Sequence, residues 1–445
     1  MDWLSSHRWT CVVMLGLVGL ALVCTAGLAG VVWFQLRSHN GRVAAVDRIA
    51  YVGPDGNIYV IDRDGGNRVA VTADAEIPTQ SGGRLYRFPT WSPDNRWIAF
   101  VGVEVGPRSI STNTLYAASV AGGELKPLFS SQESGPFYLY WSPDARRVAF
   151  LASEDGGLSL RLAGLDGQTR LLDTGAPFYF TWSPTGQALI THVGGSQPLG
   201  RIGRLDITAD QPEVLLDRPA VFLSPAWSPT GDAVLFAAEL DEEGPALYLA
   251  DEHGQPQRAL VRYQGAISFG WSPQGDRVAF VVTNQPRPAG LGQFAWGRVQ
   301  VIDRAGGEPR AISTKNALAF FWAPDGRAIA YLTILTGEQL PQGDLMPASS
   351  VLQQEGLRLQ WHVVALSTEE DRALAKFVPA PGFLSLLPFF DQYAQSLRLW
   401  SPDSAALVYS ARDAAGRSGV WVIAADGQTP PQRIADGDLP AWSWR

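Results

Sequence analysis

Residues 91–100 read WSPDNRWIAF, and a recognisable copy of this stretch returns along the rest of the chain. Clear copies are WSPDARRVAF at 141–150, WSPQGDRVAF at 271–280 and WAPDGRAIAY at 322–331. The copies open on tryptophans at the following positions: Trp91, Trp141, Trp182, Trp227, Trp271, Trp322, Trp400 and, in a truncated last copy, Trp442. A motif that returns every few tens of residues indicates a repeat architecture.

One complete unit shows what each repeat builds. A short apolar run at 137–141 ends on Trp141, and Ser-Pro-Asp then favours a tight turn, because proline presets φ and aspartate can bond the backbone. Runs at 148–152, 158–162 and 169–172 complete the unit. Four short antiparallel strands per repeat are typical of a β-propeller blade. We expect the tryptophans to be wedges between blades, and Asp94, Asp144 and Asp325 to cap turns.

The spacing of the tryptophans predicts the number of blades. Successive markers lie 41 to 51 residues apart, with one gap of 78, and a base period of about 42–45 is that of a four-stranded blade. Seven units carry the tryptophan turn and three further strands. The eighth is split, with its first strand at 440–442 and the other three at 49–72. We therefore predict an all-β, eight-bladed propeller (seven as the alternative) closed by pairing the C-terminal strand with the N-terminal strands.

The first apolar run predicts a membrane anchor. Residues 11–34 carry no charge and are long enough to span a bilayer, with Trp9 and Trp33 at the two ends. We predict a tail at 1–10, a retained transmembrane signal anchor at 11–34, a linker at 35–48 and a propeller at 49–445. A cleaved signal peptide is the second reading, since the run contains small residues, and a lipoprotein site at Cys24 is the third.

At this point the repeats carry a family resemblance. The Trp-Ser-Pro-Asp-Gly-like turn, followed by Ile/Val-Ala-Phe and by segments such as 59–62 and 301–303, resembles the TolB-type (WD40-like) propeller repeat over 49–445. The chain also looks like the propeller of the dipeptidyl peptidases. It departs from TolB in having more repeats and a membrane segment in place of an α/β domain, and no hydrolase domain remains. The resemblance implies an extracytoplasmic binding scaffold, which places the chain at the cell membrane as a periplasmic or extracellular single-pass protein.

Composition excludes several kinds of site. The formal net charge of −8 gives no basic footprint for nucleic acid. Both cysteines lie in the first apolar run, so cysteine-based zinc sites are excluded elsewhere. No histidine pair has metal-ligand spacing and no nucleophile elbow occurs, so we predict no cofactor, no metal and no catalytic residue. The repeat tryptophans are predicted to be structural.

Long insertions predict where binding occurs. Strand direction alternates in a blade, so connections between strands two and three, and between blades, share one face, which we call the long-loop face. Insertions at 72–87, 104–113, 284–297, 336–357 and 378–396 should all emerge there. The segment 383–393 is unusually apolar and is either a partner site or a plug folded over the propeller mouth. The predicted contact residues are Arg287, Phe294, Trp296, Arg298, Phe383, Leu386, Leu387, Phe389, Phe390 and Tyr393.

The function predicted from sequence is therefore binding. We expect a membrane-anchored scaffold that binds a protein or small ligand through its long-loop face. The alternative is a glycan- or peptide-directed propeller hydrolase or lyase with its site at the channel mouth. Convergent carboxylates in a deep pocket would favour the enzyme, and a broad aromatic surface without them would favour the scaffold.

Overall fold

A computed structural model describes residues 46–107, 109–194, 200–208, 213–217, 223–283, 296–335 and 357–445. These residues belong to one compact unit, 45–445. The predicted membrane span lies outside the described residues. Among those that are described, no helix has both the length and the apolar character needed to cross a membrane.

The described residues form seven hydrogen-bonded sheets, which we give with their strands in chain order. The first contains β1 (Arg48–Val52), β2 (Ile58–Asp62), β3 (Val69–Ala70) and β32 (Asp438–Trp442). The second contains β4 (Glu76–Thr79), β5 (Gly82–Trp91), β6 (Trp97–Val105), β7 (Ile110–Ser119) and β8 (Leu125–Ser131). The third contains β9 (Gly135–Trp141), β10 (Arg147–Glu154), β11 (Gly157–Gly164) and β12 (Thr169–Gly175). The fourth contains β13 (Phe178–Trp182), β14 (Ala188–Val193), β15 (Arg201–Asp206) and β16 (Glu213–Asp217).

The remaining sheets follow the same antiparallel plan. The fifth contains β17 (Ala226–Trp227), β18 (Ala233–Ala238), β19 (Ala246–Asp251) and β20 (Pro256–Arg262). The sixth contains β21 (Ile267–Trp271), β22 (Arg277–Val282), β23 (Gly297–Asp303) and β24 (Arg310–Ala317). The seventh contains β25 (Ala319–Trp322), β26 (Ala328–Ile334), β27 (Leu359–Ala365), β28 (Asp371–Pro379), β29 (Ala406–Arg412), β30 (Ser418–Ala424) and β31 (Gln432–Asp436).

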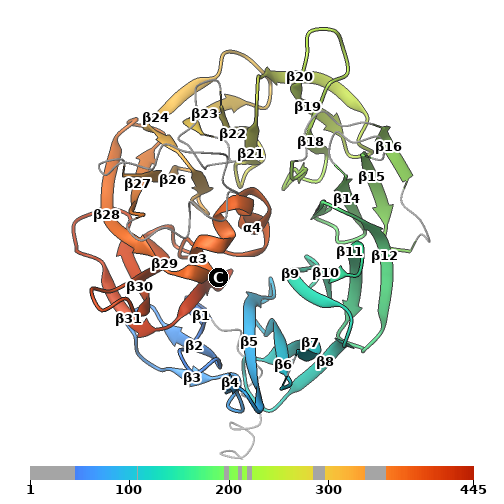
Figure 1. The fold of residues 1–445 in the computed structure, drawn as a ribbon. Helices are drawn as coiled ribbons and strands as arrows, with labels where there is room; N and C mark the ends of the chain where they lie inside the picture. Colours follow the sequence, from blue (N-terminus) through green and yellow to red (C-terminus); the bar gives the residue numbers. More distant parts are fainter. Residues whose placement is uncertain are drawn as a thin grey trace, which may run out of the picture. The chain divides into compact units, whose positions relative to one another are not determined.

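The sheets surround a central axis, as the repeat pattern predicts for a β-propeller. Figure 1 shows strands that end on repeat tryptophans, such as β5, β9 and β21, nearest the axis, with β8, β12 and β24 at the rim. Burial follows this order, because every residue of the second strand β14 is buried, whereas six of the seven residues of the fourth strand β12 are exposed or half-buried. Apolar faces are therefore covered by neighbouring sheets.

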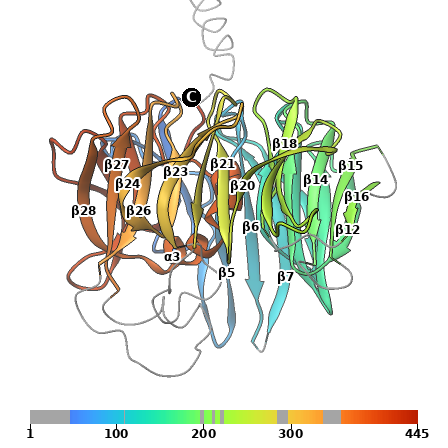
Figure 2. The same cartoon turned by 90° about the horizontal axis from the view of Figure 1, so that it is seen from above.

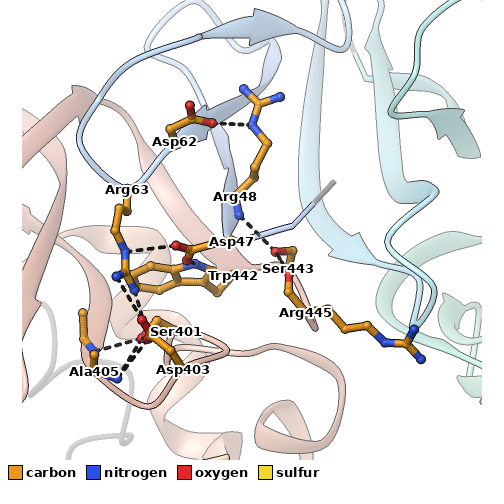
Figure 3. Close-up of polar contacts among 11 residues, drawn as sticks. Asp47, Arg48, Asp62, Arg63, Ser401, Asp403, Ala405, Trp442, Ser443 and Arg445 are labelled. Atoms are coloured by element: carbon orange, nitrogen blue, oxygen red, sulfur yellow. Dashed lines mark hydrogen bonds and ion pairs between the residues drawn. The ribbon is translucent and has the colours of Figure 1, made fainter. Parts of the chain in front are cut away.

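The predicted closure of the ring is confirmed. Strand β32 pairs antiparallel with β1, with Ile49 opposite Trp442 and Ala50 opposite Ala441. The indole of Trp442 donates to the Asp47 carboxylate at 2.8 Å. Arg63 forms two hydrogen bonds to the Asp403 carboxylate, at 3.0 and 3.1 Å, and lies over the Trp442 ring (Figure 3). Polar and aromatic contacts thus hold together segments from opposite ends of the propeller sequence.

The repeat turns are built as predicted. In the turn that follows Trp91, the Ser92 hydroxyl accepts the backbone N–H of Trp97 at 2.9 Å, and the Asp94 carboxylate accepts that of Arg96 at 3.1 Å. The Asp144 and Asp325 carboxylates make the equivalent bond in their own turns. The aspartates therefore cap turns and are engaged in structure.

Six of the eight repeat tryptophans clamp their repeat to the one before it, the exceptions being Trp227 and Trp442. The indole N–H of Trp141 donates at 3.0 Å to the carbonyl of Thr90, the residue that precedes the previous repeat tryptophan. The same bond recurs for Trp91, Trp182, Trp271, Trp322 and Trp400. An indole N–H and a backbone carbonyl that are buried or partly buried satisfy each other in this way, which explains why tryptophan opens the repeat.

Trp227 departs from this rule. Its indole N–H donates at 3.2 Å to the Gly231 carbonyl in its own turn, and the side chain is half-buried. A different contact spans the junction between the fourth and fifth sheets. Nδ1 of the buried His192 ring lies 2.8 Å from the carbonyl oxygen of Leu223, within hydrogen-bond distance. This junction is therefore joined by a histidine on β14 in place of the tryptophan clamp.

Candidate functional site

The apolar segment predicted as a loop at 383–393 is helical. It forms α3 (Pro381–Leu386), the 3-10 helix η1 (Leu387–Phe389) and α4 (Phe390–Ser396), and we call this element the helical plug. The side chains of Phe383, Leu386, Leu387 and Phe390 are buried, and Tyr393 is half-buried. Phe389 is 46% exposed. The sequence allowed either a partner site or a plug folded over the propeller mouth, and the observed arrangement matches the plug. Phe389 is the exposed side chain among the contact residues predicted in this segment.

Specific contacts hold the helical plug on the propeller. The Asp438 carboxylate of β32 accepts the backbone N–H groups of Gly382 and Phe383, at 2.8 and 3.2 Å. The Tyr138 hydroxyl donates to the carbonyl of Gln392 at 2.9 Å. Phe390 packs edge-to-face against Phe320, with ring centroids 5.3 Å apart. The plug is thus bound to widely separated sheets, and Figure 1 shows α4 close to the axis.

The plug lies on the long-loop side. Figure 2 shows α3 at one side of the propeller, where β5 and β7 each have one of their ends. The C-terminus lies at the opposite side. This is the division of connections that the alternation of strand direction predicts.

A cavity of about 430 Å³, the central cavity, lies between the helical plug and the repeat turns. Prolines of five Trp-Ser-Pro or Trp-Ala-Pro turns lie at one end of the lining: Pro143, Pro184, Pro229, Pro273 and Pro324. Phe390, Asp391, Ala394 and Gln395 of the plug line the other end. Aromatic side chains form much of the wall, including Trp182, Trp227, Trp271, Trp322, Trp400 and Trp444. A mostly aromatic cavity with a few polar groups is the usual form of a small-molecule site.

Asp391 is the single carboxylate in the described lining of the central cavity. Its Oδ1 accepts the backbone N–H of Gln392 at 3.0 Å, and its carboxylate also accepts the backbone N–H of Ser224. Burial raises the pKa of Asp391 to about 6, because the charged form loses hydration, while these N–H groups oppose the shift. Gln395 holds the same helix in place by donating to the Ser224 hydroxyl at 3.1 Å.

Arg398 is the cation of the central cavity. Its guanidinium lies 4.4 Å from the centroid of the Trp444 ring, and burial lowers the pKa of Arg398 to about 10. Within the described part of the chain, its guanidinium has no hydrogen bond or ion pair with another residue. Arg398 therefore remains charged at neutral pH, and it is part of the lining of the cavity.

The second predicted cluster is described only in part, because Arg287 and Phe294 lie outside the described residues. Trp296 is half-buried and packs against the core cluster that contains Phe383 and Phe390. Arg298 is exposed on β23, where it pairs with Asn316 of β24. The structure therefore places Trp296 against this core cluster and leaves Arg298 at the surface.

Sequence reasoning missed the polar groups of the central cavity. Asp391 lies inside the apolar segment 383–393, and Arg398 lies two residues before the repeat motif that opens at Trp400. Neither position carries a motif, because their meeting depends on ring closure and on the path of the plug. The one available signal was a charged residue within a strongly apolar insertion.

No protein-family model matches the chain, and no curated protein matches it either. Among solved structures, one from a study of two prolyl endopeptidases is similar with a TM-score of 0.54 and 13% identity, over 81% of this chain and 51% of that one. A eukaryotic initiation factor is similar with a TM-score of 0.50 and 10% identity, over 89% and 98% of the two chains. TolB from Acinetobacter baumannii gives a TM-score of 0.40 and 15% identity, over 87% and 78%.

The likeness to the prolyl endopeptidase and to the initiation factor supports the β-propeller fold and shows nothing finer. The chain spans about half the length of the prolyl endopeptidase that it resembles. At 13% and 10% identity, these likenesses do not separate a binding protein from an enzyme.

Proposed function

We propose that this chain is a ligand-binding propeller, and that the ligand occupies the central cavity. The observation that carries the proposal is a cavity of about 430 Å³ with an aromatic wall and only a few polar groups, Asp391 and Arg398 among them. Cavities of this size and lining are suited to small molecules or to one end of a chain. Many glycan-directed enzymes use a pair of carboxylates, whereas the described lining of the central cavity contains one, Asp391. This difference favours a binding function.

The proposed site differs from the long-loop face favoured by the sequence. The helical plug lies at that side, and four of the eight described contact residues predicted from the sequence are buried in it. The long-loop face remains a proposed surface for a protein partner. The contact residues proposed there are Phe389, Trp296 and Arg298. Ligand binding in the cavity and protein binding on this face are compatible, because they use different side chains.

We further propose eight blades and a membrane location. The seven-stranded sheet counts as two blades, since β28 and β29 share only the pairs Val378–Arg412 and Pro379–Ala411. An inner strand for the second of them is supported by the bridge between Trp400 and Leu407. The apolar segment 11–34 would hold the propeller at the extracytoplasmic side of a membrane. Protease digestion of intact cells tests this location, and full protection of the propeller would contradict it.

Filling the central cavity tests the proposed function. Ala394 lines the cavity on α4, so Ala394→Trp should occupy part of its volume, whereas Ala121→Trp in an exposed turn is the matched control. Calorimetric titration of the full-length chain in nanodiscs with indole, a neutral aromatic probe, measures binding. We expect binding by the wild type and the control variant, and its loss in Ala394→Trp. Failure of the wild type to bind, or equal binding by both variants, would reject the cavity as the site.

A further inference from the structure

Arg398 is a partly buried cation that no acidic residue in the described part of the propeller neutralises. Its guanidinium lies over the Trp444 ring, 4.4 Å from the ring centroid, and Arg398 is one of the residues that line the central cavity. No described carboxylate forms an ion pair with it, and burial lowers the pKa of Arg398 because the charged form loses hydration. A buried charge is costly unless it is paired, and a guanidinium is paired best by a planar anion that accepts two N–H bonds.

The residues around Arg398 favour one kind of anion as its binding partner. Trp227, Trp322 and Trp444 present aromatic surface to the same cavity. Such a wall favours an apolar body over a second polar group, because apolar surface is removed from water on binding. The cavity also holds the Asp391 carboxylate, which would repel a dianion such as phosphate more strongly than a monoanion.

We propose that the central cavity binds a monocarboxylate with an apolar body, held through two N–H bonds from the Arg398 guanidinium. This inference rests on the proposed function and adds the chemical class of the ligand. The apolar body lies against the tryptophan wall, and the carboxylate lies on the Trp444 side of the cavity.

Asp391 determines the orientation of the ligand. Its carboxylate already accepts backbone N–H groups of Gln392 and Ser224, so it does not need the ligand as a partner. Its negative charge disfavours a second carboxylate nearby, which leaves the Arg398 side as the favourable position. Removing this charge should therefore strengthen carboxylate binding.

The test compares matched probes on the full-length chain in nanodiscs. Calorimetric titration with 4-phenylbutyrate and with the uncharged 4-phenylbutyramide measures the contribution of the carboxylate. We expect the carboxylate to bind about 10- to 100-fold more tightly than the amide, as a charged hydrogen-bonded pair implies. Arg398→Gln should remove this preference, and Arg398→Lys should retain part of it because lysine keeps the charge without the fork. Asp391→Asn should increase the affinity for the carboxylate.

The outcomes separate this inference from the function on which it rests. Equal binding of the two probes to the wild type would overturn the carboxylate inference and leave a cavity that binds aromatic molecules. A thermal unfolding midpoint for Arg398→Gln near that of the wild type shows that a lost preference is not due to misfolding. A preference that persists in both Arg398 variants would also overturn the inference.

A carboxylate of this kind can belong to a small acid or to the end of a peptide. Titration with Ala-Ala-Phe and with its C-terminal amide distinguishes the two sources. Tighter binding of the free tripeptide than of 4-phenylbutyrate assigns the site to chain ends, and the opposite order assigns it to small acids. Absence of any preference for the free tripeptide over its amide excludes chain ends.

Discussion

Trp182 and Trp227 open consecutive repeats and yet hold the propeller in different ways. The indole of Trp182 donates to Tyr140 in the preceding sheet, whereas that of Trp227 donates to Gly231 in its own turn. Trp182 is buried and Trp227 is half-buried against the central cavity. The difference shows that a repeat residue can keep its place in the motif while its contact changes, and that the fourth and fifth sheets are joined by other means.

The largest effect should come from truncating a clamping tryptophan. Trp141→Ala removes a buried side chain and leaves the Thr90 carbonyl without its donor, so we expect a loss of about 3–5 kcal/mol in unfolding free energy. Trp227→Ala should cost less than half as much, because the indole is half-buried and bonds within its own turn. Urea unfolding of both variants, followed by two probes to check for a single transition, measures the difference. Equal losses would show that the clamp does not distinguish the two positions.

The next effect concerns His192, which bonds Leu223 across the junction that lacks a clamp. Burial lowers the pKa of His192 from 6.5 to about 4, so the unfolded chain binds a proton more readily than the folded one between these values. Stability should therefore fall as pH decreases from about 6.5 to 4, by up to about 3 kcal/mol. Urea unfolding across this pH range should show a shallower fall in His192→Asn, whose amide can still donate to Leu223. Parallel pH profiles for wild type and variant would contradict the assignment.

The smallest effect should come from an ion pair beside the Trp227 turn. Arg304 makes two hydrogen bonds to Asp232 in that turn, at 2.8 and 2.9 Å, and Arg63 makes the same kind of pair with Asp403 at the ring closure. Both pairs are largely solvent-exposed, so Arg304→Gln should cost roughly 0.2–1 kcal/mol and less at high salt. Arg63→Gln is the matched control. A larger loss for Arg304→Gln would indicate that the Trp227 turn depends on this pair in place of the missing clamp.

The repeat motif predicts most of the fold because it acts locally. Serine, proline and aspartate build each turn within a few residues, and the tryptophan needs only the neighbouring sheet as a partner. The closure of β1 by β32 followed from the truncated copy at Trp442. Local rules of this kind can be read without the structure.

The parts that escaped prediction depend on distant contacts. The segment 381–396 has an apolar composition that suits either a loop or buried helices, and its helical form is fixed by Asp438 and Tyr138 from other sheets. The meeting of Asp391, Arg398 and Trp444 depends on the closed ring. The altered bond of Trp227 has no counterpart in its motif, since WSPTGD differs little from the clamped repeats.

The pairing of β1 with β32 has a consequence for biosynthesis. Arg48 and Ser443, which bond each other at this seam, lie 395 residues apart in the chain. The edge of β1 in the first sheet therefore stays unpaired until nearly every other strand has been synthesised. Uncovered edges recruit other chains, so a nascent propeller needs protection for longer than a protein whose early strands pair with each other. A chaperone that recognises open sheet edges would then act at the first blade, and its release would coincide with the arrival of residues 438–442.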